Sequence, residues 1–386
     1  MKILHTADWH VGKTVRGRAR ADEHRAVLDE IVTIAQSHAV DLVVVAGDLF
    51  DTASPTPEAE QIVYQALLGL RSTGAHVVVI AGNHDNPNRL RAVAPLFGEI
   101  AVRVVAHPTR PDEGGVVDVV ARDGTTARVA LLPFVSQRGI VRADDLMSGS
   151  GAEHALAYAD RYKRLLDAIT AGFVADHVNL VVAHAFVGGG VLGGGERSAH
   201  TVFDYFVPAT AFPPSVHYVA LGHLHRAQQL PGPVPLHYCG SPLAMDFSEE
   251  RDVKVVNVID VEPGRPAAVE SVPLRSGRRL RTLRATLDEL AERAAEVGPH
   301  DYVRVVVRGA ARAGLADEVR ELIPGVVEVV VESPERAATV AERQRRAGRS
   351  PHELFAEFCA ARGHDDPRVR ALFAELLEEC SASAAH

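Results

Sequence analysis

Residues 42–51 read LVVVAGDLFD and residues 77–85 read VVVIAGNHD, and these two stretches decide the fold. Each begins as an unbroken, valine-rich apolar run of the length of a buried strand. Each run then ends in glycine followed by polar side chains, Asp48 in the first stretch and Asn83 and His84 in the second. The pattern predicts two strands that deliver ligand-binding groups at their carboxyl ends.

Helices and further strands alternate with these two runs. Residues 22–38 and 57–73 carry apolar side chains at helical spacing, before and between the two predicted strands. Further apolar runs of strand length lie at residues 129–132, 180–183 and 218–221. The alternation predicts an α/β fold. Later strands near residues 236–238 and 253–261 follow one another without helices, so we expect a mixed sheet.

Side chains that can bind metals follow five of the predicted strands. They are Asp8 and His10 after residues 1–6, Asp48, Asn83 and His84 after the two central runs, His184 after residues 180–183, and His223 and His225 after residues 218–221. Ligands of open α/β sheets bind at the carboxyl ends of the strands. Carboxylate, amide and imidazole groups without a thiolate suit Mn²⁺, Mg²⁺ or Fe. Their number predicts two ions, which would activate water and neutralise a phosphate group.

Each motif alone has a less specific interpretation. A single histidine after a strand is usually a surface or core residue, and His223 and His225 could occupy two faces of one strand. The glycine-rich residues 188–195 lack the ending of a phosphate-binding loop and predict a flexible connection. All five motifs together, each at the end of a strand, favour the metal site.

Composition narrows the class of protein. Three cysteines lie far apart, which excludes a disulfide framework and a zinc knuckle and fits a reducing cytoplasm. No apolar run predicts a membrane span or a secretory signal. The net charge of −9 by itself argues against a nucleic-acid binder, but residues 275–349 carry 15 Arg against 12 acidic residues. If the protein acts on DNA, this basic segment or a partner would make the contact.

The pattern of elements predicts three parts, residues 1–274, 275–342 and 343–386. In the second, a helix at 287–295, a strand at 302–307, a helix at 315–322 and a strand at 326–331 form a small α/β unit. In the third, Ser350-Pro351 and Asp366-Pro367 predict two helix starts. An apolar stripe follows, made of Val369, Leu372, Phe373, Leu376 and Leu377. Two short helices cannot form a core alone, so the stripe packs either on the rest of the chain or on a partner.

The series D-x-H, G-D, G-N-H-D, H and G-H-x-H resembles the calcineurin-like metallophosphoesterase superfamily, over residues 1 to about 250. Within that superfamily, residues 3–12, 46–51, 218–225 and 238–242 resemble the SbcD subunit of bacterial SbcC–SbcD nucleases. The resemblance implies two packed mixed β-sheets flanked by helices, a small α/β capping domain that contacts DNA, and a C-terminal helical segment that binds a partner.

The resemblance also implies roles for single residues. Asp8, His10, Asp48 and His225 would hold one Mn²⁺, and Asp48, Asn83, His184 and His223 the other, so that Asp48 bridges them. His84 would face the scissile phosphate and the leaving oxygen as the catalytic histidine. Asp51 stands where archaeal relatives have a second histidine.

The function implied is that of a DNA nuclease in repair and recombination, an exonuclease on duplex ends that also opens hairpins. It would work in the cytoplasm at the nucleoid, away from membranes, as a homodimer within a heterotetramer. Residues 350–380 would grip the coiled coil of an SbcC-type ATPase. The alternative is a phosphoesterase of the same superfamily that acts on nucleotides or phosphoproteins. A third interpretation, a degenerate non-enzymatic scaffold, is disfavoured because all seven ligand positions and His84 are present.

Overall fold

The computed structural model of the protein describes residues 1–136, 151–196, 206–332, 351–362 and 366–383. The chain divides into two compact units, one of residues 1–14 and 19–277 and one of residues 15–18 and 278–386. All the strand-end motifs lie in the first unit. No helix within the described residues is long and apolar enough to cross a membrane.

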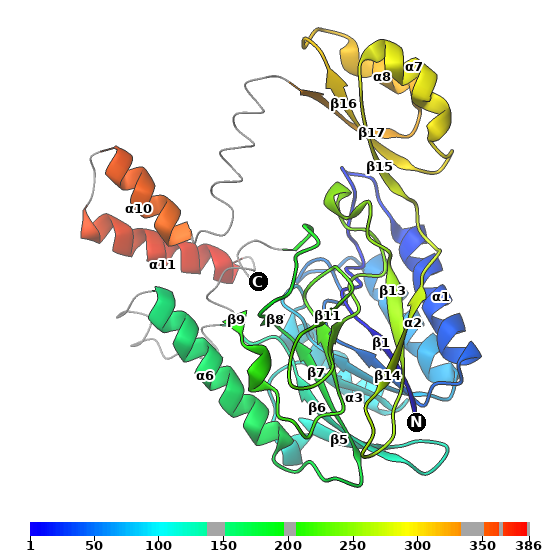
Figure 1. The fold of residues 1–386 in the computed structure, drawn as a ribbon, viewed down its shortest axis with the longest axis vertical. Helices are drawn as coiled ribbons and strands as arrows, with labels where there is room; N and C mark the ends of the chain where they lie inside the picture. The colour runs from blue at the N-terminus through cyan, green and yellow to red at the C-terminus, as the bar shows by residue number, and fades with distance from the viewer. Residues whose placement is uncertain (137–150, 197–205, 333–350, 363–365, 384–386) are drawn as a thin grey trace. The chain divides into compact units, whose positions relative to one another are not determined.

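Two six-stranded mixed sheets form the first unit (Figure 1). The first sheet has the order β14-β13-β1-β2-β3-β4, in which β1 to β4 are parallel and β13 and β14 are antiparallel additions at one edge. Its strands are β1 (Lys2–Thr6), β2 (Leu42–Val45), β3 (His76–Ile80), β4 (Val102–Val105), β13 (Val255–Asp260) and β14 (Ala268–Pro273). The carboxyl ends of β1, β2 and β3 therefore meet at one end of this sheet.

The second sheet has the order β11-β12-β10-β7-β6-β5. Its strands are β5 (Val116–Val120), β6 (Thr126–Leu132), β7 (Val178–His184), β10 (Tyr218–Gly222), β11 (Gln228–Leu230) and β12 (Leu236–Tyr238). Strands β6, β7, β10 and β12 are parallel, and β5 and β11 pair antiparallel at the two edges. A short parallel pair, β8 (Phe186–Val187) and β9 (Phe206–Val207), lies outside the two sheets.

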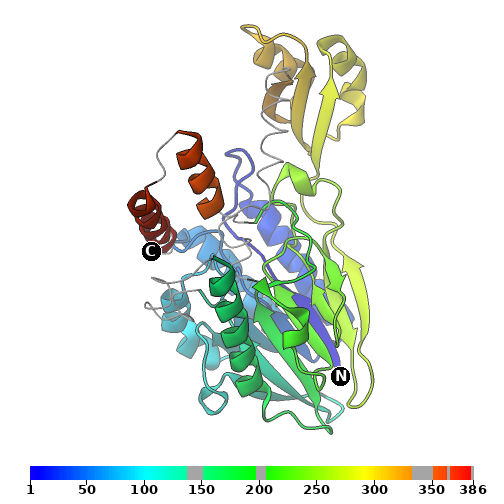
Figure 2. The same ribbon diagram turned by 60° about the vertical axis from the view of Figure 1, so that its left-hand side comes forward.

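Helices cover the outer faces of both sheets, which makes four layers. Helices α1 (Ala21–Ser37), α2 (Pro57–Ser72) and α3 (Pro87–Gly98) pack on the first sheet through Val27, Ile62 and Leu90, among others. Helix α6 (Gly151–Thr170) packs on the second sheet through Tyr158, Tyr162 and Leu166. Figure 1 shows α1 and α2 on one side of the sheets and α6 on the other, and the turned view of Figure 2 brings α6, drawn in green, to the front.

A third apolar cluster, which includes Ile3, Val44, Leu131 and Val182, fills the space between the two sheets. Because residues alternate across a strand, one face of each central strand packs on helices and the other on the opposite sheet. This explains why the runs at residues 42–45 and 77–80 are apolar throughout. The predicted α/β fold with two packed mixed sheets is confirmed.

The second unit contains a parallel three-stranded sheet in the order β15-β16-β17. Its elements are β15 (Leu280–Ala285), α7 (Leu287–Arg293), β16 (Tyr302–Arg308), α8 (Leu315–Leu322) and β17 (Val326–Glu332). Thr286 and Glu289 cap α7 reciprocally. This sheet and its helices have their own apolar core, including Leu290, Val305 and Val319. The predicted small α/β module is therefore present.

Helices α10 (Pro351–Ala361) and α11 (Pro367–Ser383) begin at the two prolines that predicted them. They pack on each other through Phe355 and Phe373, whose rings stack at a centroid distance of 3.9 Å. Ser350, the expected cap of α10, and the expected boundary after residue 342 lie outside the described residues.

Candidate metal centre

The structure brings the side chains that follow five strands to one place. Asp8 and His10 follow β1, Asp48 follows β2, Asn83 and His84 follow β3, His184 ends β7, and His223 and His225 follow β10. All are buried except Asn83, which is half-buried. Residues as far apart in the sequence as Asp8 and His225 thus form one polar cluster between the ends of the two sheets.

Potential ligand atoms in the cluster lie within bonding reach of a shared ion. Those of Asp8, His10 and His225 lie within 4.8 Å of one another, and so do those of Asp8, Asp48 and His184. The Nε2 atoms of His10 and His225 are 3.0 Å apart. The cluster therefore holds two neighbouring groups of ligand atoms.

Asp48 lies between these groups. Its Oδ2 is 3.5 Å from Nε2 of His10 and 3.5 Å from Nε2 of His184. On the side of His184, the Oδ1 of Asn83 is 2.8 Å from His184 Nε2 and 2.8 Å from His223 Nδ1. Asp48 thus reaches a histidine of each group, as a residue that bridges two cations must, and Asp8 belongs to both groups.

Electrostatics in the cluster favour bound cations. Burial raises the pKa of Asp8 to about 7, although His184 and His225 oppose the rise. Burial acts in the same direction on Asp48, but His184 and His84 outweigh it and hold the pKa of Asp48 well below its ordinary value. Burial and His84 lower the pKa of His10, which keeps its imidazole neutral and able to bind a metal. Against the effect of burial, Asp48 raises the pKa of His184 to about 9 and Glu249 raises the pKa of His225, because these carboxylates favour a positive charge beside them. Divalent cations would supply such a charge and fit this donor set.

The backbone at the site is strained. Asp8, His10, Asp48 and His223 adopt positive φ angles of 52°, 45°, 51° and 108°. Such conformations cost about 1–3 kcal/mol each in residues other than glycine. Hydrogen bonds hold them in place, including those from the N–H of Asp8 to the Gly47 carbonyl and from the N–H of His223 to the Asp8 carboxylate. The orientation of these side chains therefore comes at some cost in stability.

Glycines next to the cluster are required by close approach. A Cβ on Gly82 would clash with the carboxylate and the backbone nitrogen of Asp48, and one on Gly222 would clash with the Ala46 carbonyl. A Cβ on Gly47, whose φ is +94°, would clash with the ring of His184.

We expect Gly82→Ala to lower the free energy of unfolding by about 1–3 kcal/mol, as overpacked sites do. It should also weaken the binding of divalent metal ions, because relief of the clash must displace Asp48. Thermal unfolding and metal titration would measure both effects. Gly98→Ala is the matched control, because Gly98 is exposed and has open space around it. Equal behaviour of the two variants would contradict the close approach.

His84 is oriented by the loop after β2. Its Nδ1 donates to the Asp51 carbonyl at 2.7 Å, and its backbone N–H donates to Asp48 Oδ1 at 2.7 Å. Its ring lies edge-on to that of His10, with centroids 4.5 Å apart. His84 is also close enough to form a third ligand group with His10 and Asp48. The Asp51 side chain pairs with Lys13 at 3.2 Å.

Four supporting residues were missed by sequence reasoning. Asp85 accepts hydrogen bonds from the backbone N–H groups of Gly82, Leu49 and Phe50, and so joins the two central loops. Its position in the GNHD motif, directly after Asn83 and His84, could have indicated a role at the site. The other three are Glu196, Glu249 and Lys254, which contact His225. No motif or periodicity marked them.

The glycine-rich residues 188–195, predicted as a flexible connection, are tied to the cluster by Glu196. Its carboxylate accepts hydrogen bonds from the N–H groups of Gly193, Gly194 and His225. The loop therefore ends on the backbone of a candidate metal ligand.

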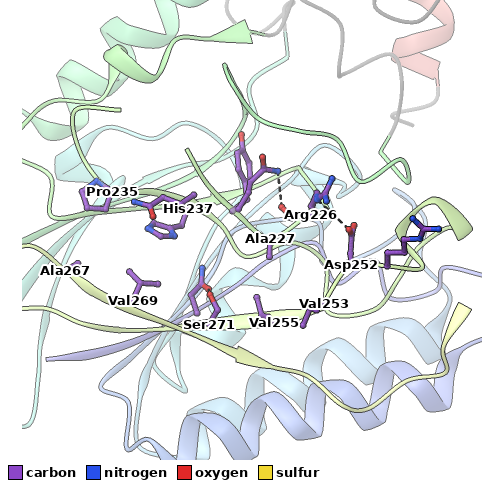
Figure 3. A pocket seen from close by; sticks show the side chains of 15 residues that line it. Arg226, Ala227, Pro235, His237, Asp252, Val253, Val255, Ala267, Val269 and Ser271 are labelled. Carbon is purple, nitrogen blue, oxygen red and sulfur yellow. Dashed lines mark hydrogen bonds and ion pairs between the residues drawn. The ribbon is translucent and has the colours of Figure 1, made fainter. Parts of the chain in front are cut away.

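A groove with a volume of about 670 Å³ lies between the last two strands of one sheet, β11 and β12, and the last two of the other, β13 and β14. Figure 3 shows Arg226 and Asp252 toward one end of it and Pro235 and Ala267 toward the other. Arg226 directly follows His225. At this end of the groove, Arg226 forms an ion pair with Asp252 at 3.5 Å.

Two mixed sheets that bring carboxylate, amide and imidazole groups together at the ends of their parallel strands define a metallophosphoesterase. Comparison with known families agrees, because residues 1–227 match the calcineurin-like phosphoesterases. Residues 276–362 match a family described as the type 5 capsule protein repressor C-terminal domain.

Individual relatives narrow the class. The chain is 39% identical over 284 residues to the SbcD subunit of the SbcCD nuclease of Bacillus subtilis, which covers 72% of this chain and 71% of the relative. It is 34% identical over 324 residues to the same subunit of Rhodobacter capsulatus, covering 78% and 80%. It is 33% identical over 289 residues to that of Escherichia coli K12, covering 70% and 68%. The chain therefore belongs to the calcineurin-like phosphoesterases and, among them, to the SbcD family of nuclease subunits.

Proposed function

We propose that the protein is a metal-dependent nuclease that hydrolyses phosphodiester bonds of DNA at double-strand ends and hairpins, as the SbcD-type subunit of a complex with an SbcC-type ATPase. The convergence of two ligand groups on Asp48, in a chain of the SbcD family, carries this proposal. Arg226 and Arg251 line the groove, where they can contact backbone phosphates. We place the protein in the cytoplasm with the nucleoid, as a dimer within the complex.

We assign Asp8, His10, Asp48 and His225 to one cation and Asp48, Asn83, His184 and His223 to the other, with Mn²⁺ as the metal. The position of Asp48 Oδ2 between His10 and His184 supports this division. The hydrogen bond made by the outer ring nitrogen of His184 also supports this division of the ligands. His184 donates from Nδ1 to the Ala46 carbonyl, so its Nε2 is the nitrogen directed at the cluster.

Divalent cations held there would supply an activated water and neutralise charge on the phosphate. The protein's own side chains hold the cations and orient the catalytic histidine. The buried carboxylates and imidazoles fix the geometry of the cation site. His84, whose Nδ1 proton is engaged by the Asp51 carbonyl, is held in one ring orientation. From there its Nε2, which carries a second proton when the ring is an imidazolium, can donate that proton to the departing oxygen.

A nuclease assay tests this function. We expect Mn²⁺-dependent cleavage of linear duplex and hairpin DNA, increased when the partner ATPase and ATP are added. A p-nitrophenyl phosphodiester serves as a small substrate in parallel. Hydrolysis of the small diester or of nucleotides without any cleavage of DNA would overturn the proposal in favour of a phosphoesterase of other substrates.

We further propose that α10 and α11 bind the coiled coil of the partner ATPase. Phe358, Val369, Leu372 and Leu376 have exposed fractions of 42–54% even though the two helices pack on each other. Large apolar side chains exposed together on short helices are typical of a docking surface. Acidic Glu375 is also exposed on α11 and would face basic residues of the partner.

Deletion of residues 350–386 should leave a folded, metal-binding nuclease that no longer co-purifies with the ATPase. The first unit has its own apolar clusters, which contain no residue of this segment. Co-purification, thermal unfolding and Mn²⁺ content would be measured. A finer variant, Leu372→Glu with Leu376→Glu, should lose the partner as well, with Leu68→Glu on α2 as an equally exposed control. Normal binding by the truncated chain would exclude docking through this segment, and its unfolding would show that the segment packs on the rest of the chain.

A further inference from the structure

His225 differs from His184 in the group that holds its outer ring nitrogen. Its Nδ1 lies 3.1 Å from Oε1 of Glu249, a carboxylate with no solvent exposure. His184, in contrast, uses Nδ1 to donate to a backbone carbonyl. A carboxylate can only accept here, so Nδ1 carries the proton and Nε2 is directed at His10 and Asp8.

Glu249 is itself held by Lys254. The Nζ of Lys254 donates to Glu249 Oε2 at 2.6 Å, to Ser241 Oγ at 3.0 Å and to the His225 carbonyl at 3.1 Å. Glu249 Oε2 also accepts from the N–H of Met245. Lys254 therefore contacts both the carboxylate and the backbone of the histidine that the carboxylate orients.

Stability alone does not explain why this ion pair is buried. Removal of two charges from water generally costs as much as their attraction returns, so such pairs add little stability on average. Here the hydrogen bonds of the pair converge on one residue of the metal centre. Partners of metal-binding histidines fix the tautomer and the ring direction, and their loss typically weakens metal binding about 10–100-fold.

We propose that Glu249 and Lys254 act together as a positioning pair that orients His225 toward the cation. The proposal rests on the metal assignment made for His225 above. Neither residue touches substrate, and neither supplies a ligand atom.

Titration calorimetry of the full chain with MnCl₂ tests the pair directly, without reference to DNA cleavage. Glu249→Ala should weaken the binding of one of the two ions by about 10–100-fold and leave the other nearly unchanged. Glu249→Gln should lose less, because its amide oxygen can still accept from Nδ1. Lys254→Met should weaken the same ion. Asp118→Ala is the control, since it removes a carboxylate that receives two hydrogen bonds from Arg128 at the far edge strand β5.

A double-mutant cycle separates positioning from general support of the fold. If Glu249 acts through His225, Glu249→Gln should weaken Mn²⁺ binding in the wild-type background and have no further effect in a His225→Ala background. Additive losses would overturn the proposal, as would unchanged affinity in both Glu249 variants. Thermal unfolding of the metal-free chains identifies a variant that does not fold, in which case the Gln and Met variants decide.

The outcome is independent of the nuclease function. A wild-type chain that binds two Mn²⁺ ions and does not cleave DNA would contradict the proposed function and leave the positioning pair standing. A wild-type chain that binds no Mn²⁺ would overturn both the metal assignment and the pair.

Discussion

Asp48→Asn is expected to reduce Mn²⁺-dependent cleavage by more than about 100-fold, the upper range for residues that only support a metal ligand. The Oδ2 atom of Asp48 lies 3.5 Å from a histidine nitrogen in each ligand group. A neutral amide is a poor bridge between two cations. Asparagine keeps an oxygen that can accept from the N–H of His84, so the loop should retain its shape. The change therefore removes charge with little change in size.

Three measurements on purified protein test this expectation: cleavage rate, bound metal per chain and thermal unfolding. We expect loss of at least one bound ion with a folded chain. Asp118→Asn, in a surface ion pair with Arg128, provides the matched change at a remote carboxylate. A folded Asp48→Asn protein with near-wild-type activity would show that the two-metal assignment is wrong.

His84→Ala is expected to cut the cleavage rate by about 10²–10⁴-fold, the usual contribution of a general acid or base. The number of bound ions should stay nearly unchanged. The structure makes this a sharp test, because His84 also lies within reach of His10 and Asp48 as a possible third ligand of a metal. Loss of one ion on substitution would reassign His84 as a ligand.

A buried histidine with a purely structural role would behave differently. Its removal would lower stability and affect the rate only in proportion to the folded fraction. His24→Ala provides this reference, because His24 is buried on α1 outside the ligand groups. If His84→Ala resembled His24→Ala in both stability and rate, the catalytic role would be excluded.

Local sequence patterns were sufficient to predict many of the strands and helix starts. Valine-rich runs that end in glycine and a polar residue identified β2 and β3, and prolines identified the starts of α10 and α11. These signals are local because the buried faces of a strand and the first turn of a helix each impose their own residue types. The assignments of DNA contact to residues 275–342 and of partner binding to the C-terminal segment stay predictions.

The sequence by itself determined the fold class, the family and the set of side chains offered at the strand ends. Only the tertiary structure decided how these side chains meet. That Asp48 lies between His10 and His184, and that Asn83 faces both His184 and His223, depends on the packing of two sheets whose strands are far apart in the chain. Glu249 and Lys254 show even more clearly that the sequence alone does not reveal which side chains meet. They lie 24 and 29 residues after His225, Glu249 at the end of a 3₁₀ turn and Lys254 directly before β13. Only the folded chain brings their charges to the ring and the carbonyl of His225.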